Sequence, residues 1–190
     1  EEYDGEASSF NMNDFDKITA GGVLELKIRQ GNDYQVKVRG DERARNRVII
    51  KKQGRELQLR MKSGNYSGSK IIVDIVLPDL EELNLSGASK ATVSDFEGDD
   101  LELELSGVAR MKIEGKVNDL RASLSGASYL DAFELKSRSS RINASGTGSV
   151  KVWTTQELKA ETSGASSVRY KGQPRDVSSN QSGASSVRRY

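Results

Sequence analysis

The chain has 190 residues, with 29 Lys and Arg against 28 Asp and Glu, and it contains neither His nor Cys. The balanced charge excludes an overall attraction to nucleic acid, and no apolar run approaches the roughly 18–20 residues of a membrane-spanning helix. Without imidazole or thiol groups, the chain lacks the commonest general base and the usual zinc ligands. We therefore expect no catalytic residues, no metal site and no cofactor.

Residues 1–9 are acidic at their start and are expected to form a disordered or extended tail. They lack a signal peptide, and since mature exported chains do not keep one, we expect that an export signal has been removed.

Residues 10–80 show an irregular alternation of apolar and polar residues that predicts short strands. Gly21, Gly22 and Val23 resemble a corner in front of an alternating strand. Further strands are expected at 34–38, 48–52, 56–61 and 70–77, with one helical turn at 41–46. We expect residues 10–80 to form an irregular cap and the first coils of one domain that covers residues 10–190.

A Ser-Gly step recurs through residues 81–190 at intervals of 18 to 20 residues. Its glycines are Gly87, Gly107, Gly126, Gly146, Gly164 and Gly183. The residues two and four before each Gly are mostly apolar and those between are polar, as in Leu-Glu-Leu-Glu-Leu at 101–105. Strict alternation of this kind predicts a strand with one buried face.

A second alternating strand follows each glycine. Each period therefore predicts a strand, a Ser-Gly corner, a strand and a looser turn, such as 95–100 or 114–118. Gly at the corner allows a backbone conformation that a side chain would hinder. The residues directly after Gly, among them Ala88, Ala127, Ala165 and Ala184, are small and are expected to fit a tight inward bend.

A short fixed period with strand-like alternation predicts an all-β fold, a β-solenoid with coils of about 19 residues. Stacked coils would pair like residues in parallel sheets, right-handed by the crossover rule for parallel strands. An antiparallel sandwich is the alternative, but it needs no recurring corner. Near the end of the chain, the positions two and four before Gly, which are expected to face inward, become polar at Thr162, Ser179 and Gln181. We expect an open last coil, which could pair with another copy in a homo-oligomer.

Several short motifs occur in a fixed order ahead of the repeat. They are Phe15-Asp16-Lys17-Ile18 leading into Gly21-Gly22-Val23, Gly31-Asn32 with Val36-Lys37-Val38, and Leu77-Pro78-Asp79-Leu80. This order resembles the head GIN domain family of Gram-negative auto-transporter adhesins over about residues 10–190. The resemblance implies an extracytoplasmic, repeat-built β domain with an adhesive role, in the periplasm, on the cell surface or secreted. It implies no catalytic residues.

Two groups of outward residues are candidates for binding. Basic residues recur three and five positions after Gly, where side chains are expected to face outward, and they predict a basic stripe. They are Lys90, Arg110, Lys112, Lys151, Arg169 and Arg188. An aromatic column lies seven residues after Gly, at Phe133, Trp153 and Tyr190, and Tyr129 lies within the basic columns. Aromatic side chains bury much area at modest entropic cost, so they predict a contact patch for sugar or protein. The alternatives are a solvated sheet face and rings that only fill space between coils.

Some solenoids are enzymes that cleave polysaccharides with clustered carboxylates. Asp95, Glu97, Asp99 and Asp100 share one turn, but its spacing does not recur, which favours a solvated turn. Three or more carboxylates with a basic group in one cleft would instead favour the enzyme.

The sequence therefore predicts a non-enzymatic interaction module that binds a glycan or a protein at the cell surface. Nucleic acid is not expected, because rings for base stacking are sparse in the basic columns. The alternatives are a polysaccharide-active solenoid enzyme and a periplasmic scaffold without a dedicated ligand.

Overall fold

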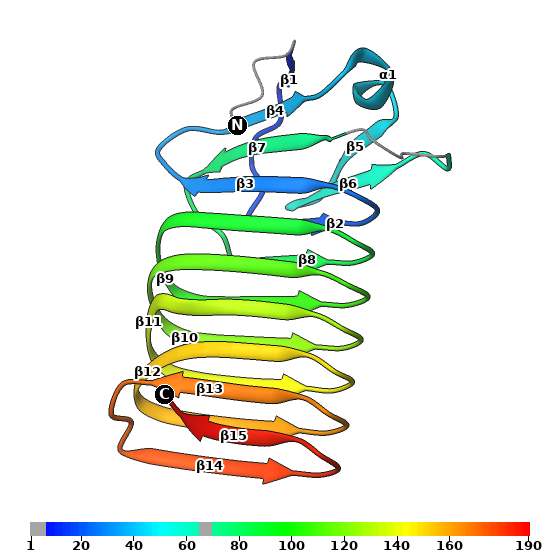
Figure 1. Cartoon of the computed structure of the whole chain (residues 1–190). Helices are drawn as coiled ribbons and strands as arrows, with labels where there is room; N and C mark the ends of the chain where they lie inside the picture. Colours follow the sequence, from blue (N-terminus) through cyan, green and yellow to red (C-terminus); the bar gives the residue numbers. More distant parts are fainter. Residues whose placement is uncertain (1–6, 65–69) are drawn as a thin grey trace.

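The computed structural model describes residues 7–64 and 70–190, and it is a β-solenoid with its coils stacked along one axis (Figure 1). Four long strands form the middle of the stack: β9 (Lys90–Leu105), β10 (Arg110–Leu124), β11 (Tyr129–Ala144) and β12 (Ser149–Thr162). Each strand crosses one face of the solenoid, bends, and returns across the other face. Ser-Gly corners join one long strand to the next. The predicted solenoid is confirmed.

Parallel pairing brings like residues into ladders. Leu103 of β9 pairs with Leu83 of β8 (Glu82–Leu85) on one side and with Ala122 of β10 on the other. All three side chains are buried, and the polar residues between them are exposed or half-buried. One continuous cluster of buried apolar residues runs from Phe15 to Val168. The narrow core is thus filled by the alternating apolar columns that the sequence predicts.

The six Ser-Gly corners have the same backbone conformation. Their glycines have φ between 70° and 81°, a region that disfavours L-residues with side chains. A Cβ built on Gly107 would lie 2.8 Å from the carbonyl oxygen of Gly87 in the preceding coil, and the other corners are equally close. The residue after each glycine also joins neighbouring coils, as where Val108 N donates to Gly87 O at 2.8 Å. The corners need glycine for both conformation and space.

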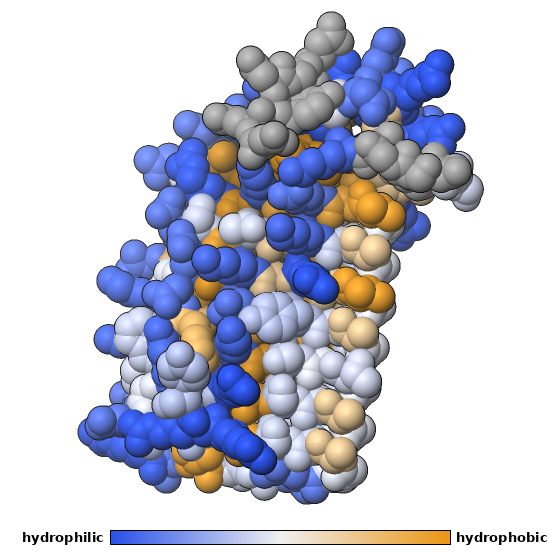
Figure 2. All heavy atoms as spheres, viewed as in Figure 1, coloured by the Kyte–Doolittle hydropathy of each residue, from blue (hydrophilic) through white to orange (hydrophobic). Residues whose placement is uncertain are grey.

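The small residues after Gly were wrongly expected to point inward. Ala88, Ala127, Ala165 and Ala184 are exposed. The inward residue comes one position later, and where it is Ser its hydroxyl donates to the carbonyl three residues back, as from Ser128 to Ser125 at 2.8 Å. A tight turn that begins at a left-handed glycine therefore places the following side chain outside. Apolar residues consequently recur along this edge of the molecule (Figure 2).

The looser turns expected at 95–100 and 114–118 are not loops. Residues 90–105 and 110–124 each form one continuous strand that bends without leaving the ladder. The bend also takes up the variation in spacing: the ladder between β11 and β12 shifts register between Ala132 and Lys136 and again between Ser137 and Ser139. Extra residues are thus absorbed at the bend, while the corners stay aligned.

The first coils stack in a different order from the sequence. β2 (Lys17–Ala20) and β3 (Glu25–Gln30) form a coil with its corner at Gly22, as predicted. β6 (Glu56–Met61) pairs with β2 and β7 (Ile72–Leu77) pairs with β3, all in parallel. β6 and β7 therefore lie outside the coil formed by β2 and β3, which contacts β8 and β9 directly.

Antiparallel strands cap this end of the stack. β4 (Gln35–Arg39) pairs with β7 and with β1 (Ala7–Phe10), and β5 (Val48–Gln53) pairs with β6. The predicted helical turn is α1 (Glu42–Arg45), where the Asp41 carboxylate accepts from Ala44 N at 2.8 Å. Residues 1–6 of the expected N-terminal tail lie outside the described residues. Among the described residues, no helix has the length and apolar character to cross a membrane.

The opposite end of the stack is open. It consists of β13 (Ser167–Lys171), β14 (Asp176–Gln181) and β15 (Ser186–Arg189). Thr162 is still buried and donates to Ser185 at 2.9 Å, but all six residues of β14 are exposed. Val177, which continues the inward column of Leu158, is 46% exposed. Within the described residues, β14 pairs with β12 alone and β15 with β13 alone.

Candidate binding site

The predicted binding residues lie on one face of the solenoid, formed by the first halves of β9–β12 together with β13 and β15. Arg110 pairs in register with Lys90 and with Tyr129. A second ladder runs through Lys112, Asp131, Lys151, Arg169 and Arg188. We call the outward side chains of these strands, from residue 90 to residue 190, the basic–aromatic face.

Lysine ammonium groups lie over the aromatic rings of this face. Lys171 Nζ lies 4.5 Å from the Trp153 ring centroid and 5.5 Å from that of Phe133. Lys151 Nζ lies 5.5 Å from Phe133 and 5.7 Å from Tyr129. Cations so placed are attracted by the ring quadrupole, by about 0.5–1 kcal/mol each at exposed sites. The two predicted groups, basic and aromatic, are therefore one interleaved cluster.

The predicted aromatic column is not a straight ladder. The register shift after Ala132 pairs Trp153 with Lys136 instead of Phe133, and Lys136 Nζ lies 5.6 Å from the Trp153 ring centroid. Phe133 instead packs edge-on against Tyr190, with ring centroids 5.2 Å apart. The rings lie near the bend, at the edge away from the Ser-Gly corners, and Phe133 and Trp153 are half-buried.

Positive charge predominates on this face. The positions three, five and seven after each repeat glycine hold seven cations and two carboxylates. The cations are Lys90, Arg110, Lys112, Lys151, Arg169, Lys171 and Arg188, and the carboxylates are Glu114 and Asp131. A hydrogen bond with Tyr129 raises the pKa of Lys151, so this ammonium group stays charged at any physiological pH. The cluster can therefore attract an anionic ligand.

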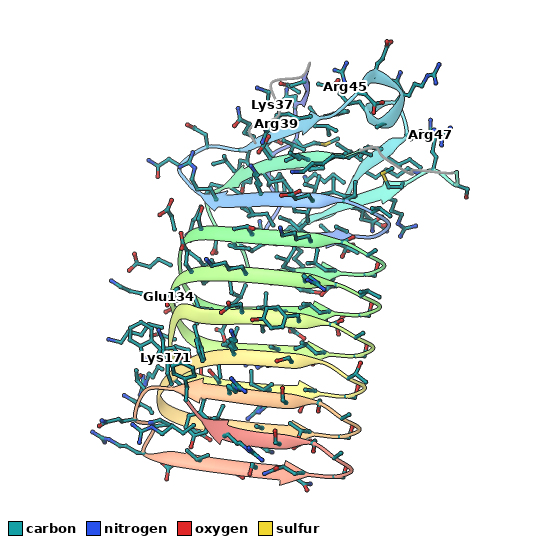
Figure 3. All side chains as sticks on the ribbon, viewed as in Figure 1. Lys37, Arg39, Arg45, Arg47, Glu134 and Lys171 are labelled. Atoms are coloured by element: carbon teal, nitrogen blue, oxygen red, sulfur yellow. The ribbon has the colours of Figure 1, made fainter. Side chains whose placement is uncertain are left out.

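Three charged residues of the cluster were missed in the sequence. Lys171 occupies the same position after Gly as the aromatic residues, so its column gave the signal, but only rings were selected from that column. Glu134 forms an ion pair with Lys171 at 3.2 Å, and Figure 3 shows both side chains at the edge where the long strands bend. Lys136 and Glu134 have no such signal, because the register shift brings them to this place.

A separate hollow of about 720 Å³ collects acidic residues. Its lining includes seven carboxylates and two basic side chains: Asp79, Glu81, Glu82, Glu97, Asp99, Asp100 and Glu102, with Lys17 and Arg121. The number of groups thus meets the condition that would favour an enzyme. Two of these carboxylates form ion pairs, Glu82 with Lys17 at 3.0 Å and Asp100 with Arg121 at 3.6 Å. In the described part of the chain, no three acidic side chains are placed to hold a metal ion.

Solved bacterial structures share this fold. A "putative adhesin" from Bacteroides fragilis has a TM-score of 0.76 at 19% identity, covering 97% of this chain and 96% of that one. A "putative adhesin" from Parabacteroides merdae has a TM-score of 0.60 at 21% identity, covering 97% and 95%. A "putative lipid binding protein" from Parabacteroides distasonis has a TM-score of 0.60 at 20% identity, covering 97% and 96%.

No curated protein has a matching sequence. A family model does match, over residues 14–174, and its description is "Putative auto-transporter adhesin, head GIN domain". The match covers most of the solenoid, from the coil with its corner at Gly22 to the end of β13. The chain therefore belongs to the head GIN domain family.

Proposed function

We propose that this protein is an extracytoplasmic interaction module that adheres to an acidic polysaccharide through its basic–aromatic face. The observation that carries the proposal is the placement of Lys151 and Lys171 against the rings of Tyr129, Phe133 and Trp153. Ammonium groups held by rings lose less conformational entropy on binding than freely moving ones. The family description and the names of two structural relatives, which both refer to adhesins, agree with this role.

An acidic polysaccharide fits this face better than a nucleic acid does. Base stacking needs open ring faces, whereas lysine ammonium groups lie over the rings of Phe133 and Trp153. Carboxylate groups repeated along a sugar chain could pair with cations that are repeated along the stack. The continuous core from Phe15 to Val168 supports residues 10–190 acting as one domain.

The experiment is binding to polygalacturonate, a uronic acid polymer, with neutral dextran as the comparison polymer. The double variant Lys151→Glu/Lys171→Glu should bind polygalacturonate at least tenfold more weakly, about 1.4 kcal/mol. Its matched control is Lys51→Glu/Lys52→Glu, with the same change in net charge at two exposed positions on β5 in the cap. The control should keep most of the affinity, and Trp153→Ala should weaken binding by removing the ring beside Lys171.

Equal losses in the two double variants would contradict the assignment, because they would indicate attraction by net charge alone. Specific binding that survives Trp153→Ala unchanged would also exclude this patch. The acidic hollow supports a second candidate function, cleavage of a polysaccharide. The same incubations test it, since release of new reducing ends from dextran, the neutral polymer that an acidic hollow would not repel, would identify an enzyme in place of an adhesin.

We also propose that the open last coil joins two copies of the chain. Outer strand edges invite pairing with another strand, and β14 and β15 each present one. β14 begins at Asp176 and β15 ends with Arg188 and Arg189, so antiparallel pairing of β14 with β15 of a second copy brings opposite charges together. Light scattering should give the mass of a dimer, and Val177→Lys should reduce it to a monomer. A monomeric wild-type protein at high concentration would refute the pairing.

A further inference from the structure

We propose that the Ser-Gly edge carries a second binding site, a groove that takes a neutral, extended glycan. The groove has a volume of about 730 Å³ and runs across the coils from Thr19 to Ser182. Three ladders line it, which lie one, two and three residues before the repeat glycines. We call it the corner groove. It is separate from the basic–aromatic face, and the proposal does not rest on adhesion through that face.

The walls of the corner groove are polar, and its floor is the backbone of the strands between them. The floor residues are Leu85, Leu105, Leu124, Ala144 and Thr162, whose side chains point into the core, and the three leucines are at most 3% exposed. One wall is a ladder of serine hydroxyl groups. The other wall contributes Asn84, Glu104, Ser123, Asn143, Glu161 and Asn180. A sugar ring has a rim of hydroxyl groups, so it matches a groove with polar side chains along both walls.

An extended peptide fits this groove less well. Peptides that add to a sheet use free backbone N–H and C=O groups. At the corners these groups already join coil to coil, as where Ser106 N donates to Leu85 O at 2.9 Å and Ser125 N donates to Leu105 O at 2.9 Å. Recognition in the corner groove therefore depends on side-chain hydroxyl, amide and carboxylate groups, whose natural partners are the hydroxyl groups of a sugar.

The charge of the lining disfavours an acidic chain. Glu104 and Glu161 are the charged residues of the lining, and no Lys or Arg of the described residues belongs to it. An acidic polysaccharide would be repelled here, in contrast to the basic–aromatic face. The two sites are thus selective for different polymers.

The repeat of the lining suits a linear polymer. Neighbouring strands lie about 4.8 Å apart, so the five steps from Asn84 to Asn180 span about 24 Å along the solenoid axis. Each coil presents one hydroxyl group and one polar wall residue to the groove. A linear glycan that lies along the axis would meet one serine hydroxyl group and one polar wall residue at each step, at about one sugar per coil.

One side chain at the start of the groove has an unused acceptor. Asn84 Nδ2 donates to Glu82 at 2.8 Å, while the Asn84 Oδ1 atom is buried and accepts no hydrogen bond from any described residue. A buried acceptor without a donor costs stability. Because this atom is buried from solvent, a ligand in the corner groove cannot reach it unless a neighbouring side chain moves.

Calorimetric titration with cello-oligosaccharides, from the dimer to the hexamer, tests the proposal. These chains of β-1,4-linked glucose are neutral and extended, and their affinity should rise with each added sugar until the groove is filled. Maltohexaose, which is neutral but coiled, should bind more weakly than cellohexaose. The variant Ser125→Trp should weaken binding of cellohexaose by at least about tenfold, because Ser125 is exposed at the middle of the groove.

Two controls make the result specific. Ala127→Trp places the same ring on the same corner, at an exposed position that does not line the groove, and should leave the affinity unchanged. Lys151→Glu/Lys171→Glu should also leave it unchanged, which separates this site from the basic–aromatic face. The proposal is overturned if no cello-oligosaccharide binds, if affinity does not depend on length, or if Ser125→Trp and Ala127→Trp behave alike.

Discussion

Replacing Gly126 by alanine is expected to lower the free energy of unfolding by about 2–4 kcal/mol. Gly126 has φ 70°, which costs an alanine about 1–2 kcal/mol. The new Cβ would also lie 2.6 Å from the carbonyl oxygen of Gly107. That oxygen accepts the hydrogen bond from Ala127 N at 2.8 Å, so it cannot move away without loosening the stack. Urea unfolding followed by circular dichroism measures the loss.

Gly54 provides the matched control for this substitution. Its φ is 60°, similar to that of Gly126, but a Cβ built there meets no atom within 4 Å. Gly54→Ala should therefore show only the cost of the left-handed conformation, about 1–2 kcal/mol. The difference between the two variants is the cost of close stacking at the corner. Equal destabilisation would show that the corner has room for a methyl group, contrary to the structure.

Replacing Leu158 by alanine is expected to cost about 2–5 kcal/mol. Leu158 is fully buried on β12, in the inward column between the last two coils. Removing three carbon atoms there leaves a cavity that a ladder of rigid backbones cannot close. Urea unfolding again gives the loss of stability.

Val177 occupies the same column one coil further on, where it pairs with Leu158. It is 46% exposed, so Val177→Ala should cost less than about 1 kcal/mol. A large loss from Val177→Ala would mean that something covers the last coil in solution. That result would support the proposed pairing of two copies.

The sequence was sufficient to predict the solenoid because two of its signals are local. Alternation within residues 101–105 indicates a half-buried strand, and the recurring Gly fixes where each strand turns. The stacking order of the first coils has no local signal. Whether β6 lies outside β2 depends on contacts between residues far apart in the chain, and the alternating pattern of 56–61 is the same in either position.

Side-chain direction was predicted well within strands and poorly at turns. Columns two and four before Gly are buried as expected as far as Thr162, because alternation fixes direction along a strand. At the corner, the left-handed conformation of Gly changes that direction, so Ala88 and its equivalents lie outside. At the bend, the register shift after Ala132 separates Phe133 from Trp153 and brings in Lys136. Counting residues from Gly could not have located this register shift.

The basic–aromatic face could be predicted in its members but not in its contacts. Column positions alone indicated that Tyr129, Phe133, Trp153 and Lys151 share a face. They could not indicate that the lysines cover the rings, since this depends on the conformations of long side chains. The corner groove was missed for another reason: its three ladders were each visible in the sequence, but a hollow between them exists only once the coils are stacked.

Successive corners are joined by the same hydrogen bond, from the residue after one repeat glycine to the carbonyl oxygen of the glycine in the preceding coil. Gly87 O accepts from Val108 N, Gly107 O from Ala127 N and Gly126 O from Thr147 N, at 2.8–2.9 Å. The junctions are therefore interchangeable, and a coil could be gained or lost without disturbing its neighbours. Such a change would lengthen or shorten the molecule by about 4.8 Å. In relatives with more or fewer coils, the longest oligosaccharide bound in the corner groove should change in the same steps.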